Sequence, residues 1–396
     1  MQIITYMFDK KKYKVSTIIT HAGQESGEHF GFVNTPVYRG STVLSQTSRE
    51  FRERSSRYFY GSKSNPNTES LSEGIRLLEN AEGCRITSSG RTAILLSLLS
   101  ILRSGDQLIL SDNVYGPTKQ IAEKFLAKMG IETLFFNPKN LDSLENKITK
   151  KTRAVFFESP GSLTFEIIDI NKLVSICSER NLFTIVDNTW ATPLYFKPFK
   201  FGIDMSVHAG TKYIVGHSDV FMGAVTYNKK TQKYVEGTFD ILRLSSNADD
   251  AYMANRGLRT INVRMEKQFA NSLKICEFLS THQSITEILY PPFHKSRDHD
   301  LWKEYFSGGG GSLMSIIINN KNNSIETLDK FIDSLSLFGI GASWGGYESL
   351  IMPIFPDRQT TKEWSKYSNS MVRIHIGLED PVDLIEDLAS SLDSLK

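Results

Sequence analysis

The sequence has few cysteines, no long hydrophobic run and no excess of charge of one sign. Its 396 residues include only three cysteines, an odd number without paired spacing, which argues against a disulfide framework or a metal site such as a zinc knuckle. No uncharged apolar run approaches the roughly 20 residues that a membrane-spanning helix needs. The 46 Lys and Arg against 44 Asp and Glu leave a net charge of +2. Such a small net charge does not attract nucleic acid or an anionic membrane surface over a long range, so binding to either is not indicated.

The sequence does have the length and the apolar content of a large folded enzyme. A hydrophobic content of 40% is enough for a substantial core. A length above twice the usual ~150 residues of a domain predicts two large domains, or one large domain with a sizeable appendage. Residues 1–14 place their charges after a very short apolar stretch, the reverse of a secretory signal, so we expect a cytoplasmic protein. Cys177 and Cys276 continue helical apolar stripes, which predicts core packing for both thiols.

Apolar runs and helical patterns alternate through the first two thirds of the chain. Residues 170–181 have the apolar spacing of a helix. The runs typical of strands that are buried on both faces lie at 107–110, 131–136, 153–159 and 182–188. This alternation predicts an α/β fold with a mainly parallel sheet covered by helices, and such sheets bind ligands at the carboxyl ends of their strands.

A second domain is predicted to begin at the helical tract from about residue 249 to 280. Within it, we expect the glycines of 307–311 to form a flexible lead into a strand. The pattern of 370–392 predicts a strand and then a closing helix that is capped near Asp380 and Pro381.

The stretch SVHAGTKYIVGHSD, residues 206–219, carries the strongest chemical signal. Lys212 follows small residues after an apolar run typical of a buried strand. A lysine at the end of such a strand is costly to charge, so its pKa should fall and its amine should become nucleophilic, as a Schiff base requires. Taken alone, Lys212 is better interpreted as an ordinary exposed lysine, but the residues around it reverse that interpretation.

Three other segments of the sequence contain residue types that pyridoxal phosphate needs. Asp187 ends an apolar run, where a carboxylate can face a cationic ring nitrogen, although a turn or helix cap is the alternative. Gly90 and Arg91 stand at the start of an apolar helical pattern. The N-terminus of such a helix can bind a phosphate, or it can be an ordinary helix start without a ligand. Tyr115 follows a strand and can stack on a ring, or can be a structural tyrosine.

Arg373 lies in an alternating strand pattern, MVRIHI. Val372 and Ile374 share one face of the predicted strand, whereas Arg373 and His375 share the other. That second face must meet water or a polar cleft, and the planar guanidinium suits a carboxylate ligand.

Longer stretches resemble a known family. They are YGSKSNPNT (60–68), SSGRTA (88–93), VYGP (114–117), FFESPGSLTFEI (156–167), IVDNTWATPLYFKPFKFGIDMSVHAGTKYIVGHSD (185–219), NRGLRT (255–260), ASWGGYESL (342–350) and VRIHIGLED (372–380). By these residues the chain resembles, from about residue 17 to 395, the Cys/Met metabolism family of fold type I pyridoxal phosphate enzymes, and is most similar to its bacterial β-lyase branch.

The resemblance implies an architecture and an assembly. Residues 1–65 would form an N-terminal arm that contributes to a neighbouring subunit, and residues 66–250 a cofactor domain around a mainly parallel seven-stranded sheet. Residues 251–396 would form a smaller α/β domain that clamps the substrate. The implied assembly is a homotetramer built as a dimer of dimers.

The resemblance also implies a role for each site residue. Lys212 would hold pyridoxal 5'-phosphate covalently and act as acid and base, while Asp187 would pair with the ring nitrogen and Tyr115 would stack on the ring. Tyr115 and Tyr60 would also be catalytic, by taking a proton from the incoming ammonium of an amino-acid substrate. The residues implied to bind the cofactor phosphate are Gly90, Arg91, Thr211 and, from a neighbouring subunit, Tyr60. The residues implied to bind the substrate are Arg373, Ser343 and Trp344.

Several positions depart from relatives in this family. The family usually has Arg where this chain has Ser62, and we hypothesise that Lys63 replaces it as a point charge without bidentate geometry. Gly116 stands where methionine γ-lyases carry a reactive cysteine, and Ser162 stands where the γ-acting branches have Asn. The last two departures favour a β-lyase.

The implied reaction is β-elimination of L-cystathionine to homocysteine, pyruvate and ammonia, a step of methionine biosynthesis. The alternatives within the family are cystathionine γ-synthase or γ-lyase activity and cysteine desulfhydrase activity. From another class, the chain could be a catalytically weak pyridoxal phosphate-binding regulatory protein, an alternative that Ser62 makes more plausible.

Overall fold

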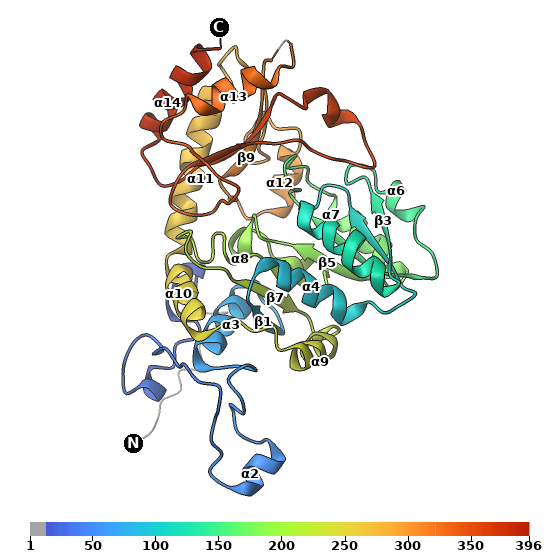
Figure 1. Ribbon diagram of the computed structural model, residues 1–396, viewed down its shortest axis with the longest axis vertical. Coiled ribbons are helices and arrows are strands. Elements are labelled where there is room, and N and C mark those ends of the chain that lie inside the picture. The colour runs from blue at the N-terminus through green and yellow to red at the C-terminus, as the bar shows by residue number, and fades with distance from the viewer. Residues whose placement is uncertain (1–12, 321, 396) are drawn as a thin grey trace.

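Two β-sheets with helices packed around them form the framework of the molecule (Figure 1). The computed structural model describes residues 13–320 and 322–395. Residues 1–12, on which the expectation about export and the start of the predicted arm depend, lie outside the described residues. Among the described residues, no helix has the length and apolar character that crossing a bilayer requires.

The larger sheet has seven strands in the order β1-β7-β6-β5-β4-β2-β3. They are β1 (Gly83–Thr87), β2 (Gln107–Ser111), β3 (Glu132–Phe136), β4 (Thr152–Glu158), β5 (Phe183–Asp187), β6 (Met205–His208) and β7 (Gly223–Tyr227). Strand β7 runs antiparallel to both of its neighbours, β1 and β6, whereas the pairs formed by β2 to β6 are parallel. Every residue of β2, β5, β6 and β7 is buried, which explains the continuous apolar runs. The predicted α/β class, with a mainly parallel sheet, is confirmed.

Helices pack against both faces of this sheet. Helix α4 (Gly90–Ile101) contacts β6 and β7, and its apolar surface on all sides fits a buried position. On the other face, α7 (Ile170–Glu179) packs on β5 and confirms the helix predicted there. The remaining helical segments of this part are α3 (Pro66–Glu79), α5 (Gly116–Gln120), η2 (Ile121–Phe125), η3 (Leu126–Met129), α6 (Asp142–Glu145), α8 (Thr192–Tyr195), η4 (Pro198–Phe201) and α9 (Gln232–Leu242).

The smaller sheet has five strands in the order β10-β11-β12-β9-β8. They are β8 (Ile285–Leu289), β9 (Leu313–Ile318), β10 (Gly339–Ile340), β11 (Leu350–Pro353) and β12 (Met371–His375). The helical segments around them are α11 (Ile261–Leu279), α12 (His299–Tyr305), α13 (Ile325–Asp333), η5 (Glu363–Tyr367) and α14 (Pro381–Asp393). The side chain of Asp380 caps α14 by accepting a hydrogen bond from the Val382 N–H, as predicted.

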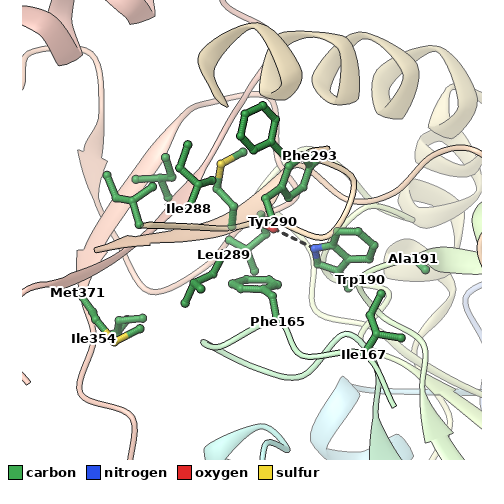
Figure 2. Close-up of a cluster of buried hydrophobic side chains, with 14 of the residues drawn as sticks. Phe165, Ile167, Trp190, Ala191, Ile288, Leu289, Tyr290, Phe293, Ile354 and Met371 are labelled. Carbon is green, nitrogen blue, oxygen red and sulfur yellow. Dashed lines mark hydrogen bonds between the residues drawn. The ribbon is translucent and has the colours of Figure 1, made fainter. Parts of the chain in front are cut away.

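A shared apolar core joins the two sheets. Figure 2 shows Trp190, which follows β5, beside Tyr290 and Phe293, which follow β8. The Trp190 Nε1–H donates to the Leu313 carbonyl at 2.9 Å. Gly310 belongs to this junction, because a Cβ there would lie 2.4 Å from the indole ring of Trp190. The glycines therefore do lead into a strand, but the prediction of a flexible segment is wrong: Gly309 to Gly311 are buried and are needed for close packing.

The helical tract predicted for the start of the second domain consists of two helices. Helix α10 (Ala248–Arg259) packs against α3 beside the large sheet, and α11 runs from there to the small sheet (Figure 1). The boundary predicted at residue 250 falls inside α10. The division into domains remains a prediction, because one core runs through both sheets. Cys177 and Cys276 are buried in that core, as predicted.

The segment before α3 is buried near its start, where Ile18, Ile19 and Ala22 pack beside α3 and α10, but around residues 48–53 it extends away from the sheets (Figure 1). It contains α1 (Val15–His21), η1 (Ser26–His29) and α2 (Ser48–Glu53). Phe30 is 98% exposed and Leu44 is 84% exposed. Such a concentration of exposed apolar side chains is typical of a surface that another chain covers.

Candidate active site

A pocket of about 180 Å³ lies at the carboxyl ends of the parallel strands β4 and β5, where the small sheet closes over the large one. The predicted site residues that line it are Gly90, Arg91, Tyr115, Asp187, Thr211, Lys212, Trp344 and Arg373. These residues are far apart in the sequence, so the fold assembles them at one place. This is the position at which open α/β sheets bind ligands.

Lys212 lies in the connection between β6 and β7, and its side chain contacts Ser343 and Trp344. Its Nζ donates to the Ser343 Oγ at 2.8 Å and lies 5.4 Å from the centroid of a Trp344 ring. Burial, and then the positive charge of Arg373, lower the pKa of Lys212 to about 8. A neutral amine, which can act as a nucleophile or a base, is therefore accessible near neutral pH.

Thr211 holds the chain in place beside this lysine. Its N–H donates to the Met222 carbonyl at 3.0 Å, and its Oγ1 accepts from the Met222 N–H at 2.9 Å. The two ends of the connection are thus bonded to each other, which limits the movement of Lys212.

Asp187 is the last residue of β5 and is buried. Its Oδ1 accepts hydrogen bonds from the Thr189 N–H at 3.0 Å and from the Thr189 Oγ1 at 2.6 Å. Burial raises the pKa of Asp187, and these hydrogen bonds together with His208 oppose the rise. Within the described part of the chain Oδ2 accepts no hydrogen bond, so it is available to a cation such as a protonated ring nitrogen.

The N-terminus of α4 forms another wall of the pocket. Ser89 caps the helix by accepting from the Thr92 N–H at 3.2 Å. A Cβ at Gly90 would lie 2.5 Å from that of Ala209, so only glycine lets the helix start come this close to the segment after β6. The free N–H groups of the first turn and the helix dipole make this wall a seat for an anion such as a phosphate.

Arg373 enters the pocket from β12. Its Nη2 donates to the carbonyl oxygens of Ala342 at 2.7 Å and Ser343 at 3.3 Å. Burial lowers the pKa of Arg373 to about 10. No carboxylate among the described residues pairs with it, which leaves its charge for a ligand. On the predicted polar face of this strand, Arg373 lines the pocket, as expected. His375 is on the same face but is buried and does not line the pocket.

Tyr60 and Lys63 do not line the pocket of their own chain. Tyr60 is 49% exposed, and its backbone forms an isolated bridge with Thr42. The Lys63 Nζ forms an ion pair with the Asp240 Oδ2 at 2.9 Å. The contact of these residues with the cofactor phosphate remains a prediction that requires a second subunit.

Sequence reasoning missed two polar residues of the pocket, Glu158 and Thr189. Glu158 ends β4 just as Asp187 ends β5, and the two residues are partners in the register of the neighbouring strands. The rule that identified Asp187, a carboxylate at the end of an apolar run, applies equally to Glu158. Thr189 had no comparable signal, because its role depends on a side-chain contact with Asp187.

The residues that the pocket brings together fit pyridoxal phosphate. An amine with a lowered pKa, a carboxylate with an open oxygen and an N-terminal helix turn match the aldehyde, the ring nitrogen and the phosphate of that cofactor. Fold and site thus define a pyridoxal phosphate-dependent enzyme of fold type I.

The chain belongs to the family of Cys/Met metabolism PLP-dependent enzymes, whose model matches residues 16–393. It is 34% identical over 393 residues to cystathionine beta-lyase MetC of Escherichia coli (96% of this chain, 98% of the relative). It is 35% identical over 398 residues to an L-alanine/L-glutamate racemase of Wolbachia pipientis wMel (96% and 97%). The crystal structure of cystathionine gamma-lyase from Lactobacillus plantarum complexed with L-serine matches with a TM-score of 0.89 and 25% identity (97% and 99%).

Proposed function

We propose that this enzyme cleaves L-cystathionine by β-elimination to homocysteine, pyruvate and ammonia, as a step of methionine biosynthesis in the cytoplasm. One arrangement carries the proposal. The Lys212 Nζ donates to the Ser343 side chain while the Arg373 guanidinium donates to the Ser343 carbonyl. A carboxylate bound by Arg373 and Ser343 would therefore hold the α-carbon of an amino acid beside the lysine amine.

Arg373 begins the reaction by binding the substrate carboxylate. Its guanidinium is buried and has no acidic partner in the described chain, so a charge-assisted bidentate contact compensates its desolvation. The Trp344 ring beside Lys212 supplies an apolar wall that excludes water from the reacting bonds. Binding thus orients the bond from Cα to hydrogen toward Lys212.

Lys212 then moves the proton. With a pKa near 8, its released amine is a base of suitable strength to remove the Cα proton. The same Nζ can deliver that proton to the departing homocysteine sulfur when the Cβ–S bond breaks. The remaining three-carbon fragment is hydrolysed to pyruvate and ammonia.

Pyridoxal phosphate, when bound, supplies the electron sink that makes the Cα proton acidic. Asp187 would keep the ring nitrogen protonated through its open Oδ2, and Tyr115 would cover one face of the ring. Gly90, Arg91 and Thr211 would hold the phosphate, with Tyr60 and Lys63 added from a neighbouring subunit of a homotetramer. Either Tyr115 or Tyr60 would accept the proton of the incoming substrate ammonium, and it would do so as its phenolate. Since burial raises the pKa of Tyr115, positive charge nearby, such as that of Arg91 and Arg373, would have to favour its ionised form.

An amino-acid racemase is a second candidate, favoured by the similarity to the Wolbachia pipientis racemase. It would use the same proton removal at Cα but return the proton to the other face of the carbon, without breaking a bond to sulfur. The γ-acting alternatives remain in consideration because the L. plantarum structure matches over nearly the whole chain.

One product assay separates these reactions. The purified enzyme is incubated with L-cystathionine, L-cysteine, L-methionine and L-alanine, and pyruvate, 2-oxobutyrate, free thiol and D-alanine are measured. Pyruvate with homocysteine from cystathionine supports the proposal. A preference for 2-oxobutyrate would indicate a γ-lyase, pyruvate with sulfide from cysteine a desulfhydrase, and D-alanine as the main product a racemase. No turnover of any substrate, with a bound cofactor, would favour the regulatory alternative.

A further inference from the structure

Glu158 is a carboxylate in the pocket wall that the reaction above does not use. It ends β4 and lies in register with Asp187 on the neighbouring strand β5. Both residues line the pocket. The large sheet therefore presents two acidic side chains side by side at the same edge, although the ring nitrogen of the cofactor needs only one.

Both oxygens of Glu158 are engaged by residues that also line the pocket. Its Oε2 accepts from the Tyr115 N–H at 2.7 Å, and its Oε1 accepts from the Ser162 Oγ at 2.8 Å. Tyr115 comes from the segment after β2 and Ser162 from the segment after β4. One carboxylate thus joins two separate loops at the mouth of the pocket.

The first of these bonds holds the backbone N–H of Tyr115, while the Tyr115 carbonyl accepts from the Thr118 N–H at 2.8 Å. Tyr115 stands at the N-terminal end of the short helix α5, and its side chain makes no capping hydrogen bond. The ring is 44% exposed, so packing alone does not determine its direction. The hydrogen bond from the backbone N–H to Glu158 sets the position from which the ring extends.

The second bond sets the direction of the Ser162 hydroxyl. Ser162 follows Pro160 and Gly161, which also line the pocket. Gly161 packs so closely on Asn113 that a Cβ there would lie 1.9 Å from the Asn113 Nδ2. The loop is therefore confined, and Glu158 sets the direction in which the Ser162 hydroxyl points.

The electrostatics agree with a tightly enclosed pair of acids. Burial, and then the charge of Asp187, raise the pKa of Glu158 well above its ordinary value, while the bonds from Ser162 and Tyr115 oppose the rise. A cation at Asp187 would reduce the repulsion between the two carboxylates. Glu158 is thus sensitive to whatever occupies the pocket.

We propose that Glu158 is a positioning residue of this enzyme, which aims the Tyr115 ring at the cofactor and holds the Ser162 hydroxyl at the substrate end of the pocket. The cofactor part rests on the family's use of pyridoxal phosphate, and the substrate part rests on the proposed function. Glu158 itself need not touch a reacting atom.

The test compares Glu158→Ala, Glu158→Gln and Ser162→Ala with the wild type. The readouts are the visible circular dichroism of bound pyridoxal phosphate, the dissociation constant of the cofactor from the apoenzyme, and kcat and KM separately. Glu158→Ala should reduce the visible band and weaken cofactor binding about tenfold, the order expected when a buried hydrogen-bond partner is lost. Glu158→Gln, which keeps an oxygen for Tyr115, should restore most of both. Ser162→Ala should raise KM and leave the visible band intact.

Asp204→Ala provides a matched control. Asp204 is also buried beside a strand of the large sheet, where it accepts from the Thr184 N–H at 3.0 Å, but it does not line the pocket. It should lower the melting temperature without changing the visible band. If Glu158→Ala behaves like this control, with an unchanged band and unchanged cofactor affinity, the proposal is overturned.

The cofactor readouts require no turnover. If cystathionine gives no pyruvate while Glu158→Ala still loses the band, the proposed function fails and the positioning role of Glu158 toward Tyr115 stands. If cystathionine is cleaved and the band does not change, the positioning role fails alone.

Discussion

The pocket and the N-terminal arm, residues 13–65, differ in how many of their contacts are made within a single chain. In the pocket, Lys212 bonds to Ser343 and Arg373 bonds to the same residue, so contacts made over long sequence distances complete the wall. In the arm, Phe30 and Leu44 are almost fully exposed. Eight predicted site residues line the pocket, whereas the arm contains only two, Tyr60 and Lys63, which do not line the pocket of their own chain. A single chain thus builds most of the pocket wall but leaves part of the arm exposed.

Charge interactions do not compensate for this difference in the arm. Arg57 pairs with Glu25, Glu28 and Glu69, but all four side chains are at least 41% exposed. Ion pairs at such exposure contribute about 0–1 kcal/mol each. Helix α1 packs against α3 and α10 of its own chain, so this lack of contacts concerns the part of the arm around α2. We infer that this part reaches its stable position against another subunit, and the following changes test the two regions in turn.

The largest effect is expected in the pocket, at Lys212. Lys212→Ala removes the group that moves the Cα proton, and general acid and base catalysis contributes about 10²–10⁴-fold, to which the loss of the covalent attachment adds. We expect turnover of cystathionine to fall below detection by pyruvate release. The cofactor should still bind, as measured by its absorbance after gel filtration. Full activity of this variant would refute the proposed mechanism.

Arg373 should have the next largest effect. Arg373→Ala removes a charge-assisted contact worth about 1.5–3 kcal/mol, so kcat/KM should fall about 10- to 150-fold, mainly through KM. Arg373→Lys keeps the charge but not the planar fork and should recover only part of the loss. Both are measured by steady-state kinetics with cystathionine. A change confined to kcat would contradict a role in substrate binding.

The pH dependence of cofactor loading tests the charge of Lys212 directly. Below a pKa of about 8 the amine is protonated and cannot attack the cofactor aldehyde, so the loading rate of the apoenzyme should rise about tenfold per pH unit and level off above pH 8. Arg373 lowers this pKa by its positive charge. Arg373→Gln should therefore move the midpoint to higher pH, as followed by rapid-mixing absorbance. A midpoint that stays in place would exclude Arg373 as a cause.

A charged side chain introduced at Leu44 tests whether another subunit covers the arm. Leu44→Glu places a carboxylate on an apolar residue that is 84% exposed in one chain. If a neighbour covers it, burial of that charge should dissociate the assembly and reduce activity about tenfold or more. Analytical ultracentrifugation gives the mass. The control is Val382→Glu, at an apolar position in α14 that is 59% exposed and outside the arm. Equal behaviour of both variants would disprove a special role of the arm.

The smallest effect is expected at Lys63. In one chain it pairs with Asp240, and both side chains are about 40% exposed. If it also reaches the phosphate of a neighbouring subunit, Lys63→Ala should weaken cofactor affinity about 2- to 5-fold, since an exposed pair contributes only about 0.2–1 kcal/mol. The cofactor dissociation constant is measured by fluorescence. An unchanged constant would end the idea that Lys63 replaces the arginine missing at Ser62.

The sequence predicted β2, β3, β4 and β5 of the large sheet, most clearly β2 and β5, which are buried on both faces and leave a continuous apolar signal. It did not predict β1 and β7 as strands. It could not predict that β7 lies between β1 and β6, since strand order depends on packing. For the same reason the ion pair of Lys63 with Asp240, 177 residues away in the chain, had no local signal.

The pocket was predictable where a residue type follows an apolar run, as at Asp187, or precedes an apolar helix, as at Gly90. It was not predictable where a side chain acts through its neighbours. Glu79 and His208 form a buried hydrogen bond at 3.0 Å, and His208 is one of the groups that oppose the rise in the pKa of Asp187. His208 ends β6 and Glu79 ends α3, but neither side chain lines the pocket, so the sequence pattern gives no signal for their connection with Asp187.

The bonds between Thr211 and Met222 have a practical consequence for engineering. They tie both ends of the connection that carries Lys212, and Gly345, with φ +84°, passes over the same connection so closely that a Cβ there would lie 2.9 Å from the Lys212 backbone. Insertions or larger residues in either segment would move the amine. A library meant to change substrate range is better directed to Ser162 and Leu163, where variation can reshape the pocket and leave the lysine where it is.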